Sequence, residues 1–128
     1  MDYQDYIARY NSSDEKAKAR FFTEDAVMES SIAKASGREE ILAQIARAHK
    51  SVREELRPRV VIQQGDYVMA ELDAAFIAQE DDPHNFFHPF KEGESKAWRF
   101  FGVYQLREGK ISHLRPAFWP TGWEIPPF

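Results

Sequence analysis

The chain has 128 residues, of which 43% are hydrophobic, 30% charged and 14% aromatic, the composition of a globular domain with one buried core. Its net charge of −4, with Lys and Arg scattered among carboxylates, argues against nucleic acid as a partner, because phosphate binding needs a basic face. The absence of cysteine excludes disulfides and thiolate chemistry.

The sequence shows no signal for a membrane or for export. No apolar run approaches the roughly 20 residues that span a bilayer. Residues 1–5 lack the basic and apolar pattern that begins a signal peptide. We therefore expect a cytoplasmic protein with no membrane partner.

Two short helices are predicted at the start of the chain. The first is indicated by apolar side chains at i, i+3, i+4 and i+7, namely Tyr3, Tyr6, Ile7 and Tyr10. A polar break over 11–13 ends this helix. Ser12 followed by Glu15 forms a capping box, which predicts a second helix that runs to Arg20.

A short strand and the longest helix are predicted next. Residues 26–32 form the strand, and Ser36 with Glu39 repeats the capping box at the start of a helix that runs to about Glu55. Pro58 marks the break after this helix. Its buried face is expected to hold Ile41, Leu42, Ile45, Ala46, His49 and Val52.

Four strands in two hairpins are predicted in the second half. Residues 59–63 and 67–78 form the first pair, and residues 96–106 and 110–115 form the second. Gly109 supplies the positive φ that the short second turn requires. Because helices and strands are largely segregated, the fold class is α+β with an antiparallel sheet. Strands this aromatic need a cover, so we expect a curved sheet closed by the helices around an apolar pocket for a small molecule.

Two segments are predicted to be irregular. Residues 79–95 form a polar connection whose aromatic cluster over 86–90 is expected to act as a lid or an interface. His84 and His88 lie near two aspartates there, but the segment lacks metal-ligand spacing, so we expect no metal site. The apolar, proline-rich tail over 118–128 is expected to fold back over the domain or to pack on a partner subunit.

Three segments resemble the nuclear transport factor 2-like superfamily. Residues 23–27 (Thr-Glu-Asp-Ala-Val) resemble its usual entry into the first strand, and residues 36–41 (Ser-Gly-Arg-Glu-Glu-Ile) resemble the start of its third helix. Residues 102–111 (Gly-Val-Tyr-Gln-Leu-Arg-Glu-Gly-Lys-Ile) closely resemble the closing hairpin of limonene-epoxide hydrolases. The superfamily also contains SnoaL-like polyketide cyclases, ketosteroid isomerase and scytalone dehydratase. These motifs specify fold rather than chemistry.

The resemblance covers nearly the whole chain and implies a single SnoaL-like domain over 1–128, with the aromatic tail over 118–128 irregular. The implied fold is a cone-shaped barrel of a strongly curved antiparallel or mixed sheet, closed by three N-terminal helices around an apolar pocket. The resemblance also implies a homodimer. An apolar tail favours the same conclusion, because a soluble monomer seldom tolerates such an exposed patch.

Most catalytic residues of these relatives have no counterpart in this chain. The epoxide hydrolase positions hold residues that cannot activate water, namely Met28, Ser30, Leu72, Ala74 and Pro116. The base and the acidic donor of ketosteroid isomerase would fall near Ser30 and Phe100 and are missing, whereas Tyr6 matches its helix-one tyrosine. The scytalone dehydratase pair is replaced by Asn11 and Leu72. Epoxide hydrolysis is therefore not expected.

The residues expected to face the pocket are mostly apolar and aromatic, which suits a hydrophobic ring compound. The expected substrate-binding set is Tyr10, Met28, Ser30, Leu72, Phe76, Trp98, Phe100, Tyr104 and Phe118. Tyr6 and His49 are the candidate catalytic residues, because a phenol can polarise a carbonyl and an imidazole can move one proton each way near neutral pH. The alternatives are a core histidine bonded to a carbonyl or a tyrosine, and a helix tyrosine that packs its ring.

The opposite side of the strands is polar. Its residues are Glu71, Asp73, Arg99, Gln105, His113 and Arg115. This pattern favours a surface lattice of ion pairs, each worth at most about 1 kcal/mol. A slip of one residue would reverse both faces and make Glu71, Asp73 and His113 the catalytic group.

The sequence supports two functions. The first is a lyase, isomerase or cyclase that needs no cofactor and acts by acid–base proton transfer on a small hydrophobic ring compound bearing a carbonyl. Enolisation requires only a positioned donor and a base in a dry cavity. The second is a non-catalytic domain that binds a hydrophobic ligand or serves as a dimeric scaffold. The expected partners are the small ligand and a second copy of the chain.

Overall fold

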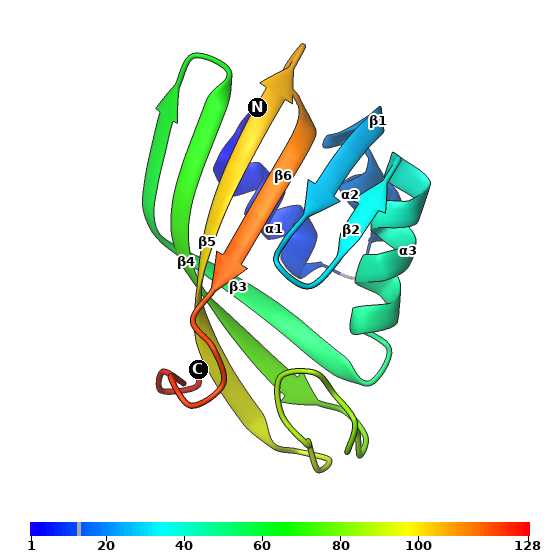
Figure 1. Ribbon diagram of the computed structural model, residues 1–128, viewed down its shortest axis with the longest axis vertical. Coiled ribbons are helices and arrows are strands. Elements are labelled where there is room, and N and C mark those ends of the chain that lie inside the picture. The colour runs from blue at the N-terminus through cyan, green and yellow to red at the C-terminus, as the bar shows by residue number, and fades with distance from the viewer. Residues whose placement is uncertain (13) are drawn as a thin grey trace.

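A computed structural model describes residues 1–12 and 14–128 as one six-stranded sheet with three helices. The strands are β1 (Phe22–Glu29), β2 (Lys34–Ser36), β3 (Val52–Gln64), β4 (Tyr67–Ala78), β5 (Ser95–Arg107) and β6 (Lys110–Phe118). The helices are α1 (Tyr3–Asn11), α2 (Glu15–Ala19) and α3 (Arg38–Ala48). Figure 1 shows β3, β4 and β5 bending strongly along their length, with α3 beside β1 and β2.

The sheet is mixed and open. Its strand order is β2-β1-β6-β5-β4-β3, and neighbours are antiparallel except for the parallel pair β1–β6. The predicted α+β class, the curved sheet and the helical cover are confirmed. The sheet does not close into a barrel, because β2 and β3 remain its two edges in the described part of the chain.

The predicted extent of the longest helix is wrong. It ends at Ala48, and Val52–Gln64 is a strand that pairs with β4 along its whole length. Val52 and Leu56 are buried and share one face of the strand with the half-buried Glu54 between them, as the alternation of a strand requires. Pro58 lies inside this strand rather than ending a helix, and it is tolerated because β3 is an edge strand with a register shift next to it.

The predicted helix starts are also corrected. The N-cap of α2 is Asp14, whose carboxylate accepts from the backbone N–H of Ala17, rather than Ser12. The N-cap of α3 is Gly37, with φ +94° and no side-chain cap, whereas Ser36 ends a strand, β2, that the pattern did not predict. In the predicted polar break over 11–13, Ser13 lies outside the described residues.

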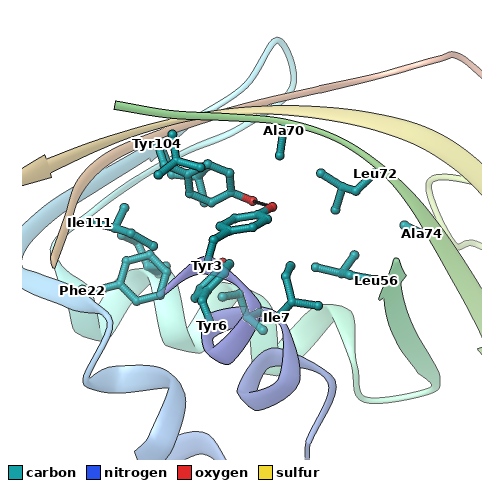
Figure 2. Close-up of a cluster of buried hydrophobic side chains, with 14 of the residues drawn as sticks. Tyr3, Tyr6, Ile7, Phe22, Leu56, Ala70, Leu72, Ala74, Tyr104 and Ile111 are labelled. Carbon is teal, nitrogen blue, oxygen red and sulfur yellow. Dashed lines mark hydrogen bonds between the residues drawn. The ribbon is translucent and has the colours of Figure 1, made fainter. Parts of the chain in front are cut away.

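Two features hold α1 against the sheet. Tyr3 and Tyr6 point from α1 toward the sheet, where the Tyr3 and Tyr104 hydroxyls are hydrogen bonded at 3.0 Å (Figure 2). At the other end of α1, the Asn11 amide donates to the Leu56 carbonyl at 2.9 Å and accepts from the Leu56 N–H at 2.8 Å. This amide thus forms hydrogen bonds with backbone groups that an edge strand otherwise leaves unpaired.

The closing hairpin and the tail follow the predicted pattern. Glu108 and Gly109, between β5 and β6, both have positive φ, as a tight two-residue hairpin turn requires. The tail returns along β5, because Ile125 forms a bridge with Ala97. The Arg57 guanidinium also lies 4.0 Å from the centroid of the last ring of the chain. No helix among the described residues is long and apolar enough to cross a bilayer.

Gly102→Ala is expected to lower the free energy of unfolding by about 1–3 kcal/mol. A Cβ at this position would lie 2.7 Å from Cε1 of Tyr104, two residues along the same strand face, and would push that ring from its place. Urea denaturation measures the effect. In a Tyr104→Ala background the same substitution should cost little, and an equal cost in both backgrounds would show that the ring is not what excludes a side chain here.

Candidate functional site

A cavity of about 270 Å³ lies against the inner face of the sheet. It is lined by Tyr6, Tyr10, Met28, Ser30, Ile32, Gln44, Ile45, Ala48, Glu54, Leu56, Leu72, Phe76, Phe86, Phe87, Phe100, Phe101, Gly102, Tyr104, Leu114, Pro116 and Phe118. Nine of these residues are aromatic, although Phe101 directs its ring to the outer face, next to Trp119. Within the described chain a single lining residue is charged, so the lining is dominated by ring surface.

Most of the residues predicted to line the pocket do so. Those that line it are Tyr6, Tyr10, Met28, Ser30, Leu72, Phe76, Phe100, Tyr104 and Phe118. Trp98 and His49 do not line it. Trp98 is fully buried behind the wall, because Phe87 of the β4–β5 connection packs 5.2 Å from it and takes the place nearer the cavity.

His49 lies behind the cavity and not on its surface. It caps the C-terminus of α3, and its Nε2 lies 3.0 Å from Oε2 of Glu54. The side chains of His49 and Glu54 are 17% and 11% exposed. The imidazole therefore contacts the cavity through the carboxylate of Glu54.

Glu54 is the charged lining residue that the sequence pattern missed. The Tyr10 hydroxyl donates to its Oε2 at 3.2 Å, so this one oxygen contacts both Tyr10 and His49. Its Oε1 has no hydrogen-bond partner among the described residues and is not fully buried. A carboxylate with one oxygen fixed and the other free can accept a proton from a bound molecule.

A signal for Glu54 exists in the sequence. Val52, Glu54 and Leu56 alternate with polar residues, and all three point to the inner face once the segment is a strand. The helical prediction through this segment placed Glu54 off the apolar stripe and so hid it. Gln44 and Ala48 of α3 were missed as lining residues as well.

Three tyrosines bring hydroxyl groups to the cavity. Tyr6 and Tyr104 pack edge to face with centroids 5.7 Å apart, and Tyr10 lies 6.1 Å from Tyr6. Burial raises the pKa of each of the three well above its usual value, and the charge of Glu54 contributes to the raised pKa of Tyr10 and of Tyr6. These hydroxyls therefore stay protonated at neutral pH and can donate hydrogen bonds.

Phenylalanine rings form another wall. Phe76 and Phe87 are stacked with centroids 4.9 Å apart, and Phe118 lies 5.1 Å from Phe87 and 5.2 Å from Phe100. Phe76 is the direct cross-strand partner of Glu54. The carboxylate therefore stands where the phenylalanine wall meets the tyrosines.

The polar residues of the opposite sheet face stay away from the cavity. Asp73 and Arg99 are cross-strand partners whose Oδ1 and Nε lie 2.7 Å apart, and Arg59 extends this pair to Glu71. His113 Nε2 lies 2.8 Å from a Glu29 carboxylate oxygen. This arrangement is the predicted surface lattice, so the slip that would have made Glu71, Asp73 and His113 catalytic does not occur.

No metal cluster forms in the described part of the chain, where His, Cys, Asp and Glu side chains nowhere gather in threes suited to an ion. His88 instead lies 3.5 Å from a Glu94 carboxylate oxygen. The polar side chains among the described lining residues are Glu54, Gln44, Ser30 and the three tyrosines.

Comparison with known proteins identifies the family. The family model of the SnoaL-like domain matches residues 3–114. A search of curated proteins found no match. A candidate polyketide cyclase of known structure from Xanthomonas campestris shares 23% identity, with 89% of this chain and 84% of that chain covered and a TM-score of 0.78.

Two further solved structures share the fold. An LEH-like epoxide hydrolase from M. tuberculosis is 16% identical, with 91% of this chain and 79% of that chain covered and a TM-score of 0.73. A protein of ketosteroid isomerase-like fold from Catenulispora acidiphila, in complex with trimethylamine, is 15% identical, with 94% of this chain and 86% of that chain covered and a TM-score of 0.75.

Burial of the tyrosines predicts a loss of stability at alkaline pH. Burial raises the pKa of Tyr3 to about 12, whereas tyrosine in an unfolded chain ionises near pH ~10. Its contribution is therefore complete below about pH 10 and is lost as pH rises from there toward the folded value. Urea denaturation at increasing pH measures this decline. The free energy of unfolding of Tyr3→Phe should fall less steeply with pH than that of the wild type. Tyr67→Phe changes an exposed tyrosine, so its free energy of unfolding should fall with the wild-type slope. Equal slopes in all three proteins would contradict the assignment.

Proposed function

The chain belongs to the SnoaL-like domain family, and from this membership and the cavity we propose that it is an enzyme that moves protons on a small hydrophobic ring compound bearing a carbonyl. The reaction class is that of a lyase, isomerase or cyclase, and no cofactor takes part. One observation carries the proposal: Glu54 lines an aromatic cavity that is also lined by three tyrosines, and one oxygen of its carboxylate has no hydrogen-bond partner among the described residues.

Glu54 is the base in this proposal. Its Oε1 takes a proton from the carbon next to the carbonyl, and the electrons of the broken C–H bond form the C=C bond of an enolate. The proton now on Glu54 returns to a different carbon in an isomerisation. In a cyclisation the enolate carbon attacks a second carbonyl instead, and the proton goes to the oxygen of that carbonyl.

His49 is a positioning residue in this proposal, not a proton shuttle. It contacts Oε2 of Glu54 at 3.0 Å, and Tyr10 donates to the same oxygen at 3.2 Å. Two donors on one oxygen fix the rotamer of the carboxylate and leave Oε1 as the oxygen that meets the substrate.

Tyr6 stabilises the enolate oxygen. Its hydroxyl remains protonated because burial raises its pKa, and it donates to the oxygen on which negative charge develops. Tyr104 lines the same cavity, and its hydroxyl, bonded to that of Tyr3 at 3.0 Å, is available as a second donor when Tyr3 donates to it.

The phenylalanine wall suits the apolar part of the substrate. Phe76, Phe87, Phe100 and Phe118 present ring surface and displace water from the reacting groups, which strengthens the hydrogen bonds of the site. A solved structure of the same fold is in complex with a small organic ligand, trimethylamine. The epoxide hydrolase chemistry of another neighbour is not proposed, because Met28, Leu72 and Pro116 supply no acid, base or cation to the cavity.

Deuterium exchange into 2-tetralone, followed by proton NMR in D₂O, tests the base. The wild type should speed exchange at the carbons beside the carbonyl over buffer alone. Glu54→Gln should reduce that acceleration by about 10²–10⁴-fold, and Tyr6→Phe by about 100-fold or more. His49→Ala should leave measurable exchange at a reduced rate, because it removes only the support of the carboxylate.

Glu55→Gln is the matched control. Glu55 is the next residue of β3 and faces away from the cavity, and its Oε2 lies 3.2 Å from Nη2 of Arg57. The Glu55→Gln protein should exchange deuterium into the ketone at the wild-type rate. A Glu54→Gln protein that exchanges as fast as the wild type would remove Glu54 as the base, and a wild-type rate equal to that of buffer would contradict the reaction for this class of ketone.

A second candidate function, a dimeric scaffold, is favoured by an apolar patch on the outer face of the sheet, next to the ion-pair lattice. Ile62, Met69 and Phe101 are 58%, 54% and 37% exposed and lie on adjacent strands, with Ile62 directly opposite Met69. Trp119 continues this surface, with its ring centroid 6.3 Å from that of Phe101. Contiguous apolar surface of this kind is typical of a face that a second subunit covers.

Met69→Glu is expected to convert a dimer into a monomer, measured by light scattering after size-exclusion chromatography. The new carboxylate would have to be buried without a partner at the proposed interface. Val61→Glu places the same change next to Ile62 in β3 but on the inner face, opposite Ala70, and should leave the dimer intact. A wild type that is monomeric at all concentrations would contradict the proposed dimer.

A further inference from the structure

The charge of the cavity restricts what it can bind. Among the lining residues that the structure describes there is no Lys, Arg or His, and Glu54 is the one acidic side chain. An anionic substrate, with a carboxylate or a phosphate, would meet this carboxylate and find no cation to pair with. The electrostatics therefore favour a neutral or a positively charged molecule.

The rings around Glu54 present surfaces that attract cations. Phe76 is its direct cross-strand partner and is stacked on Phe87 at 4.9 Å, while Tyr10 is bonded to its carboxylate and packs 6.1 Å from Tyr6. The faces of such rings carry partial negative charge, and ammonium groups bind to them. A carboxylate next to several ring faces is the arrangement that suits an organic ammonium ion.

The basic side chains already near Glu54 do not occupy its free oxygen. His49 contacts Oε2, and Oε1 has no partner among the described side chains. Lys18 lies with Nζ 5.3 Å from the centroid of the Tyr10 ring, but it pairs with Glu15 at 3.0 Å and does not line the cavity. Oε1 of Glu54 therefore remains available to a positively charged group of the ligand.

We propose that the ligand is a hydrophobic ring ketone that carries a protonated or quaternary nitrogen, with this nitrogen held between Oε1 of Glu54 and the adjacent ring faces. The inference rests on the proposed use of this cavity as the substrate site and names the class of substrate. The two roles of Glu54 are compatible, because a cationic nitrogen acidifies the C–H bonds next to it. The group that the carboxylate attracts thus brings an acidic proton to its free oxygen.

A pair of probes of the same shape and different charge tests this inference. The first is 4-hydroxyphenyltrimethylammonium and the second is 4-tert-butylphenol, in which carbon replaces the charged nitrogen. Isothermal titration calorimetry with the wild type should show the ammonium probe binding at least about tenfold more tightly. In Glu54→Gln this preference should fall to about threefold, because only the ring faces remain, and in Glu55→Gln it should be unchanged. Circular dichroism checks that the variants are folded.

The wild-type comparison needs no variant, so it decides the question even if Glu54→Gln does not fold. Equal affinity for the two probes, tighter binding of the neutral probe, or a preference as large in Glu54→Gln as in the wild type would overturn the inference. Ketone exchange without an ammonium preference would contradict this inference alone. An ammonium preference without ketone exchange would contradict the proton-transfer reaction and leave the binding chemistry standing.

Discussion

A carboxylate in an aromatic hollow is costly unless hydrogen bonds replace the water it loses, and this constraint organises the protein around Glu54. The two groups that replace water come from different elements, Tyr10 from α1 and His49 from the end of α3. The carboxylate itself comes from β3. The two helices and the edge strand therefore have to meet at one point, and the cavity lies beside that point.

The meeting of these elements depends on how an edge strand is held. β3 has a sheet partner on one side only, so the backbone groups on its other side need different partners. The side-chain amide of Asn11 pairs with both backbone groups of Leu56. Asn11 follows Tyr10 directly in the chain, and Leu56 lies two residues after Glu54. This clamp fixes the end of α1 against β3 and so sets the position of the Tyr10 hydroxyl. An amide suits this place because it can donate and accept at the same time.

The parts of the fold that were predictable from the sequence are those with a strong local cause. Apolar side chains alternate with polar ones along β4 and β5, and this alternation identifies the inward face, which holds Leu72, Phe76, Phe100 and Tyr104. The tight turn at Gly109 identifies β6 as the antiparallel neighbour of β5. The start of β3 was not predictable in this way. Its residues are compatible with a helix, and pairing with β4 decides the outcome. Placing this segment in a helix hid Glu54 and made His49 look like a cavity residue. Similarly, nothing local shows that Phe87 will cover Trp98.

In the proposed function, Glu54 puts the base on a different wall of the hollow from the one that the family resemblance suggests. The resemblance to ketosteroid isomerase and to epoxide hydrolases points to Ser30 and Pro116 as positions where a carboxylate would be expected, and both line this cavity without one. A hollow of about 270 Å³ is small enough for side chains from several walls to reach the same bound atom. A base on β3 can therefore serve a substrate as well as one on β1 or β6, provided that its rotamer is fixed. In this chain Tyr10 and His49 both contact Oε2 of Glu54, and these two contacts hold the carboxylate of β3 in one rotamer.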